Sequence, residues 1–89
     1  MDWDDLRVFL AVARDESLSR AGRRLGMDPS TVGRRVARLE QALGGALFVK
    51  SPQGYVPTPE GARLISHAEA AERALTGAAD ALGQPGDLT

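Results

Sequence analysis

The segment from residue 28 to residue 43 constrains the fold most, because it carries the signals of a helix with two different faces. Asp28 is suited to cap the free backbone N–H groups of a helix start, and Pro29 suits the first helical position. Four apolar residues follow at helical spacing, namely Val32, Val36, Leu39 and Leu43. A second face at the same spacing carries a hydroxyl and three guanidiniums, from Thr31, Arg34, Arg35 and Arg38. The pattern predicts a helix that buries one side and offers a cationic side to an anionic partner, or else to solvent alone.

The positive charge of the chain is concentrated around this helix. The 89 residues include 11 basic and 12 acidic ones, for a net charge of −1. Residues 20–50 carry seven basic and two acidic residues (+5), whereas residues 1–19 and 51–89 each carry two basic and five acidic residues (−3). Because the local field governs association with a polyanion, this distribution favours a nucleic-acid partner despite the net charge.

Length and composition exclude several classes of protein. A chain of this size forms one small domain. It has no cysteine, its one histidine is His67, and no run of apolar residues approaches the roughly 20 needed to span a membrane. The start is acidic, unlike a secretory signal. We therefore expect a soluble, cytoplasmic protein that is not an enzyme and has no metal, cofactor or membrane partner.

Two shorter helices are predicted before the cationic helix. The first runs from about Asp4 to Arg14, and its adjacent acids Asp4 and Asp5 are interpreted as a favourable helix start. The second runs from about Leu18 to Leu25 with Ser17 as its N-cap, and Gly22 within it would allow a close approach by another helix. Two helices joined by a short turn that contains glycine form a helix-turn-helix.

A hairpin and a long helix are predicted after the cationic helix. Residues 47–50 and 55–57 are typical of two short strands around a turn, which together would form a wing. The last helix is predicted from the Thr58 cap to about Leu82. Its apolar residues are spaced alternately four and three apart, as in a coiled coil, and are Leu64, Ala68, Ala71, Leu75, Ala78 and Leu82. We expect this seam to pair two copies of the chain, the alternative being that the helix packs on its own domain.

A helix-turn-helix followed by a wing suggests how double-stranded DNA would be bound. The second helix of such a unit enters the major groove with its N-terminal residues toward the bases, and flanking elements contact the backbone. The predicted DNA contacts are Arg20, Arg24, Pro29, Ser30, Thr31, Arg34, Arg35, Arg38, Lys50, Gln53 and Gly54. For Arg34, Arg35 and Arg38, the choice between a guanine edge and a phosphate is left open. Arg20 and Arg24 on the preceding helix are expected to contact phosphates.

Residues 18–40 resemble the signature of LysR-type transcriptional regulators. The resemblance continues through Leu43-Gly44, Leu47-Phe48, Gly54-Tyr55 and residues 58–61, and covers nearly the whole chain. It implies a mainly α, winged helix-turn-helix DNA-binding domain (residues 1–57), a linker helix for dimerisation (residues 58–83) and a hinge (residues 84–89). It further implies a bacterial regulator that binds an inverted-repeat operator as a homodimer, with helix 30–43 in the major groove.

The resemblance has departures that bear on function. Gly33 is added to the predicted DNA contacts, although it stands where family members often carry serine. Gln53 stands where an arginine is common in the wing, so that attraction to the minor groove should be weaker. The family's effector domain is not in the sequence, so a truncated piece is expected, the alternative being a free-standing DNA-binding module. A small-molecule effector is expected only if such a domain exists. The competing hypothesis is a winged-helix protein-interaction module that binds no DNA.

Overall fold

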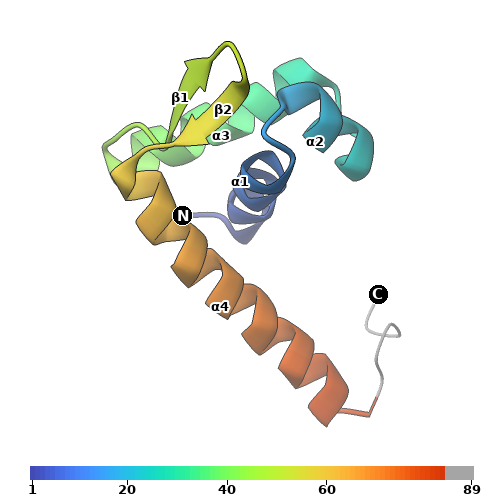
Figure 1. Cartoon of the computed structure of the whole chain (residues 1–89). Coiled ribbons are helices and arrows are strands. Elements are labelled where there is room, and N and C mark those ends of the chain that lie inside the picture. The colour runs from blue at the N-terminus through green and yellow to red at the C-terminus, as the bar shows by residue number, and fades with distance from the viewer. Residues whose placement is uncertain (84–89) are drawn as a thin grey trace.

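The computed structural model describes residues 1–83 and contains four helices and one hairpin (Figure 1). The elements are α1 (Trp3–Asp15), α2 (Leu18–Leu25), α3 (Pro29–Leu43), β1 (Phe48–Ser51), β2 (Gly54–Pro57) and α4 (Pro59–Ala81). The predicted fold class, a mainly α winged helix-turn-helix with a long last helix, is confirmed. The predicted hinge lies outside the described residues. None of the described helices is long and apolar enough to cross a membrane.

Each helix begins at a side-chain cap, as the sequence predicts for three of them. In all four cases a side-chain oxygen accepts a backbone N–H of the first turn, which satisfies a donor that the helix leaves free. The capping residues are Asp2, Ser17, Asp28 and Thr58, and the donors are Asp4, Arg20, Ser30 and Gly61. These caps fix where the helices start, so the predicted and observed starts differ by at most one residue.

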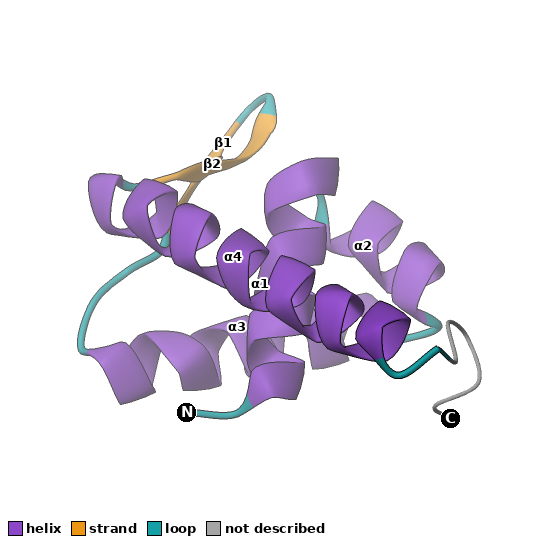
Figure 2. Cartoon of the chain, turned by 90° about the horizontal axis from the view of Figure 1, so that it is seen from below, coloured by secondary structure: helices purple, strands orange, loops and turns teal. Residues whose placement is uncertain are grey.

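Helix α1 forms the centre of the molecule and packs against α2, α3 and α4 (Figure 2). Its residues Val8, Phe9 and Val12 are fully buried. The Phe9 ring lies 5.2 Å from the ring of Phe48 at the start of the wing, so one aromatic pair joins α1 to the hairpin. Ala21 and Val32, also fully buried, bring α2 and α3 onto the same core.

The turn between α2 and α3 is tight because Gly22 has no side chain. A Cβ at this position would lie 2.5 Å from the carbonyl oxygen of Met27. The Met27 N–H in turn donates to the carbonyl of Gly22 at 2.8 Å. A close approach at Gly22 therefore occurs, but its nearest neighbour is the backbone of the turn and not another helix as predicted.

The wing is a two-stranded antiparallel hairpin that is tied to the end of α1. The register pairs Phe48 with Pro57 and Val49 with Val56. The backbone N–H of Tyr55 donates to the carbonyl of Glu16 at 3.0 Å, which holds the hairpin beside the α1–α2 turn. This contact places the wing on the same side of the molecule as the start of α3.

Helix α4 packs on the domain only along its first half and then projects away from it (Figure 1). Ala68 is 2 % exposed within this one chain, and Leu64 packs partly against the same core. Arg14 of α1 holds the next turns through Glu72, with Nη2 to Oε1 at 2.8 Å. Leu75 and Leu82, further along, are more than half exposed. The predicted seam thus divides into a part packed within the chain and a part open to solvent.

One residue of the predicted apolar stripe of α3 is not in the core. Val32, Val36 and Leu39 are buried, but Leu43 is 45 % exposed. The prediction was wrong for Leu43, which is the last residue of α3 and directly precedes the left-handed Gly44 that ends the helix.

Candidate nucleic-acid interface

The N-terminal turn of α3 is an exposed surface beside the wing. Pro29 and Ser30 are exposed and Thr31 is half-buried. The Arg34 guanidinium lies one turn further along and donates from Nη2 to the Thr31 hydroxyl at 3.1 Å. The Asp28 carboxylate accepts both the backbone N–H and the hydroxyl of Ser30, at 3.1 and 3.2 Å. The cap therefore places one negative charge at the helix end that was predicted to face DNA.

The other two arginines of the cationic face of α3 are held by acids of α1. Arg38 donates from Nε and Nη2 to the two carboxylate oxygens of Asp5, both at 2.7 Å. Arg35 donates from Nη1 to Asp4 at 2.5 Å. The prediction that Asp4 and Asp5 only favour the helix start was thus incomplete, because both acids pair with α3 across the domain.

Asp5 is the most deeply placed of these acids, since the residue is 3 % exposed. Hydrogen bonds from Arg38, aided by the charges of Arg38 and Arg35, lower the pKa of Asp5 below its ordinary value, against the effect of burial. The carboxylate is therefore ionised near neutral pH. It forms a charged pair with Arg38, whose side chain stays 59 % exposed.

The two arginines that α2 was predicted to offer to phosphates are held in the same way. Arg24 donates from Nε and Nη2 to the carboxylate of Asp15 at 3.0 and 2.7 Å, and this contact lowers the pKa of Asp15. Arg20 donates from Nε and Nη2 to the Asp15 carbonyl at 3.1 and 2.7 Å. Among the five arginines predicted to contact DNA, only Arg34 has no partner on α1 in the described part of the chain.

Two hollows show which predicted residues the fold brings together. One, of about 370 Å³, is lined by Thr31, Arg34, Arg35 and Arg38. The other, of about 310 Å³, lies between α2, α3 and the wing and is lined by Glu16, Ser17, Leu18, Ser19, Pro29, Lys50, Gly54 and Tyr55. Residues of three separate elements therefore meet around the start of α3.

Two predicted contacts differ from the rest in their surroundings. Gly33 faces the Leu18 side chain, since a Cβ added at Gly33 would lie 3.4 Å from the Leu18 Cδ1 atom. It also lines a cleft between α3 and the wing. Gln53 is exposed at the tip of the hairpin, where its backbone N–H donates to the Ser51 hydroxyl at 3.2 Å.

The sequence contained a signal for the acid pair that the prediction did not use. Asp5 precedes Phe9 by four residues and Val8 by three, which places it on the buried face of α1. A carboxylate on a buried face requires a charged or hydrogen-bonding partner. The arginine face of α3 was the available source of that partner.

Comparison with known proteins agrees with this geometry. Residues 3–62 match the family described as "Bacterial regulatory helix-turn-helix protein, lysR family". The chain belongs to the LysR family. As a LysR-family helix-turn-helix domain it is a DNA-binding regulatory module, not an enzyme.

The chain matches only a part of each of its named relatives. The chain is 46 % identical over 68 residues to "HTH-type transcriptional regulator BbuR" of Bordetella bronchiseptica, covering 76 % of this chain and 21 % of the relative. It is 39 % identical over 83 residues to "HTH-type transcriptional activator AmpR" of Rhodobacter capsulatus, covering 93 % of this chain and 29 % of the relative. The chain thus spans less than a third of the length of these relatives.

A solved structure extends the comparison to a DNA complex. The fold matches "Crystal structure of CbnR_DBD-DNA complex" with a TM-score of 0.83 and 26 % identity, over 90 % of this chain and 92 % of that one. The LysR domain described here therefore has the architecture of a domain that has been crystallised with DNA.

Proposed function

We propose that this LysR domain binds a double-stranded operator with inverted-repeat symmetry, as a homodimer, in the cytoplasm of a bacterium. The observation that carries the proposal is that the start of α2, the exposed start of α3 and the wing meet around one hollow, lined among others by Ser19, Pro29 and Lys50. In this arrangement α3 enters the major groove, α2 lies along the phosphates, and the wing lies beside the neighbouring backbone.

The exposed N-terminal surface of α3 is proposed to read bases. Arg34 is the residue best suited to this role, because its guanidinium is exposed and bonded only to a neutral hydroxyl. Arginine can donate two hydrogen bonds to the O6 and N7 of guanine, which discriminates against the wrong base by about 1–3 kcal/mol. Ser30, Thr31 and Gly33 accompany it along the same turn.

The remaining predicted contacts are proposed to be phosphate contacts. Each of the arginines among them uses part of its guanidinium for α1 and retains further N–H groups, and the four are Arg20, Arg24, Arg35 and Arg38. In the wing, Lys50 and the turn at Gln53 and Gly54 would approach the DNA backbone.

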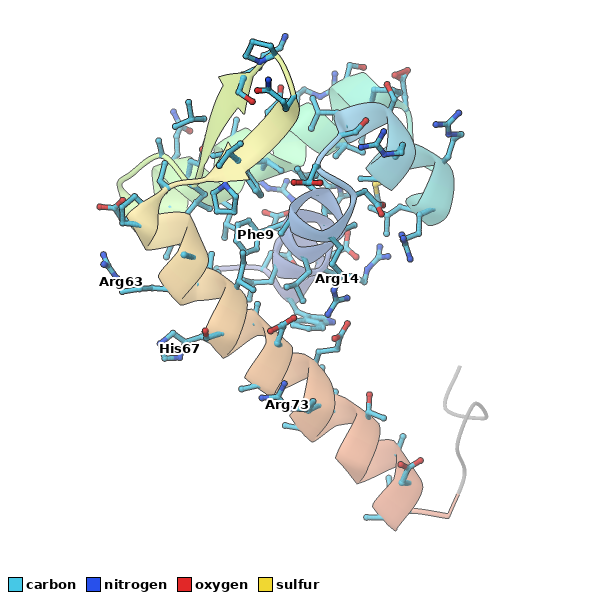
Figure 3. All side chains as sticks on the ribbon, viewed as in Figure 1. Phe9, Arg14, Arg63, His67 and Arg73 are labelled. Carbon is cyan, nitrogen blue, oxygen red and sulfur yellow. The ribbon has the colours of Figure 1, made fainter. Side chains whose placement is uncertain are left out.

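Salt titration of DNA affinity tests this proposal. Each phosphate contact contributes about −0.9 to the slope of log affinity against log salt concentration. We expect a steep slope for the wild type and a weakened operator complex for Arg34→Ala. Arg63→Ala is the matched control, because it removes the same charge from α4, where the Arg63 side chain points away from the wing (Figure 3). A flat slope, or equal affinities for the two variants, would contradict the proposal.

The open part of the α4 seam is proposed to pair two copies. This part begins at the half-buried Ala71 and continues through the exposed Leu75, Ala78 and Leu82. Leu75 and Leu82 are 54 % and 66 % exposed. Leu64 and Ala68 would support it from within each domain. Leu75→Glu should sediment as a monomer and bind the operator much more weakly, whereas Thr76→Glu, beside the seam, should remain a dimer. A dimeric Leu75→Glu variant would refute the pairing.

A further inference from the structure

The charged pairs that join α1 to α3 have a consequence for DNA selectivity, which rests on the function proposed above. The start of α1 carries three acids, Asp2, Asp4 and Asp5, and all three lie within 4.0 Å of a guanidinium of α3. Asp5 is nearly buried, while its partner Arg38 is more than half exposed. The carboxylate therefore acts from behind the arginine and leaves the outer side of the guanidinium free.

We propose that Asp5, assisted by Asp4, is a positioning residue that determines specificity. It fixes the direction of Arg38 and cancels much of the net charge that this part of α3 presents to any phosphate chain. Attraction to DNA of arbitrary sequence is purely electrostatic, whereas operator binding adds base contacts. Masking the charges of Arg35 and Arg38 therefore weakens binding to non-specific DNA more than binding to the operator. Arg34 has no acidic partner among the described residues and stays available for bases.

The geometry supports positioning as well as masking. Two parallel hydrogen bonds of 2.7 Å from Nε and Nη2 hold the planar guanidinium of Arg38 in one orientation, with Nη1 left over. Arg35 is held by one bond from Nη1, so its remaining donors are less restricted. The two arginines line the same hollow as Thr31 and Arg34.

The test compares Asp5→Asn with the wild type on two probes, the operator duplex and a random-sequence duplex of the same length. Asparagine keeps the shape of the side chain and removes the charge. We expect the salt slope on the random duplex to steepen by about one. Lowering the salt from 200 to 50 mM should then raise the affinity of the variant roughly fourfold more than that of the wild type. The ratio of operator to random affinity should fall. Asp80→Asn, which removes the same charge at an exposed site of α4, should change neither quantity.

A double variant shows whether Asp5 acts through Arg38. In an Arg38→Gln background, Asp5→Asn should no longer change the slope. Asp4→Asn removes the more exposed acid and frees Arg35, so it should shift the slope in the same direction. It replaces Asp5→Asn in the test if circular dichroism shows that Asp5→Asn does not fold. An unchanged slope and ratio in both folded single variants would overturn the inference, as would equal weakening on both probes.

The outcomes also separate this inference from the function on which it rests. If the wild type prefers the operator and depends steeply on salt, but Asp5→Asn behaves like Asp80→Asn, only the role of Asp5 is refuted. If the wild type binds neither duplex, the proposed function and the inference are both refuted.

Discussion

Helix α4 contacts Leu47, the residue before β1. Because of this contact, glycine-to-alanine substitutions at Gly61 and Gly77 of α4 should have opposite effects on stability. A Cβ at Gly61 would lie 2.1 Å from the carbonyl oxygen of Leu47 and 3.1 Å from its carbonyl carbon. The same oxygen accepts the backbone N–H of Thr58 at 3.0 Å, so it cannot move without disturbing that bond. At Gly77, no atom would lie within 4 Å of an added Cβ.

The size of the difference follows from three contributions. Helix propensity alone favours alanine over glycine by about 1 kcal/mol at either position. At Gly61, overpacking against the backbone costs about 1–3 kcal/mol, and the disturbed hydrogen bond of Thr58 costs about 1 more. Gly61→Ala should therefore destabilise the fold by about 1–3 kcal/mol, and Gly77→Ala should stabilise it by up to about 1 kcal/mol.

Thermal unfolding followed by far-ultraviolet circular dichroism measures both variants. For a domain of this size, each kcal/mol shifts the Tm by roughly 4–8 °C. The Tm of Gly61→Ala should fall below that of the wild type, and the Tm of Gly77→Ala should equal or exceed it, at one fixed protein concentration. If Gly61→Ala melted as high as Gly77→Ala, the close packing of α4 on Leu47 would be refuted.

Three further predictions concern the core, a cap and the acid pair. Phe9→Ala removes a fully buried ring that packs on Phe48 and should lower the free energy of unfolding by about 3–5 kcal/mol in urea titrations; a loss below about 1 kcal/mol would contradict this packing. Asp28→Ala removes the cap of α3 and should cost about 1 kcal/mol by the same measurement, and no loss would mean that the cap is unimportant. The pKa of Asp5 is lowered by Arg38, so its contribution to stability is present above its unfolded pKa of 3.8 and is lost as the pH falls through the lower folded value. Asp5→Asn should flatten this acidic part of the curve of stability against pH, and an unaltered curve would contradict the pairing.

The order and limits of the elements could be predicted because local signals determine them. Ser17, Asp28 and Thr58 mark helix starts by capping chemistry, which depends only on neighbouring backbone groups. The apolar spacing of α3 identified its buried side up to Leu39. It could not show that the last turn of α3 extends past the core, and so it included Leu43, which the fold leaves 45 % exposed.

The site was less predictable because its charges interact across the fold. The spacing of Arg34, Arg35 and Arg38 defined a cationic face, but only tertiary packing shows that two of the three meet acids of α1. The heptad spacing of α4 likewise could not distinguish Ala68, which is buried within the chain, from Leu75, which is exposed. Periodicity identifies a face and not its partner.

The most direct test of the central claim, that α3 binds in the major groove, is a methylation-interference experiment on an operator selected from genomic fragments. Guanine N7 lies in the major groove and adenine N3 in the minor groove. Methylation at guanine N7 in two symmetric half-sites should prevent binding, and Arg34→Ala should abolish the effect at one guanine of each half-site. Interference at adenine N3 alone, with none at any guanine N7, would contradict the account.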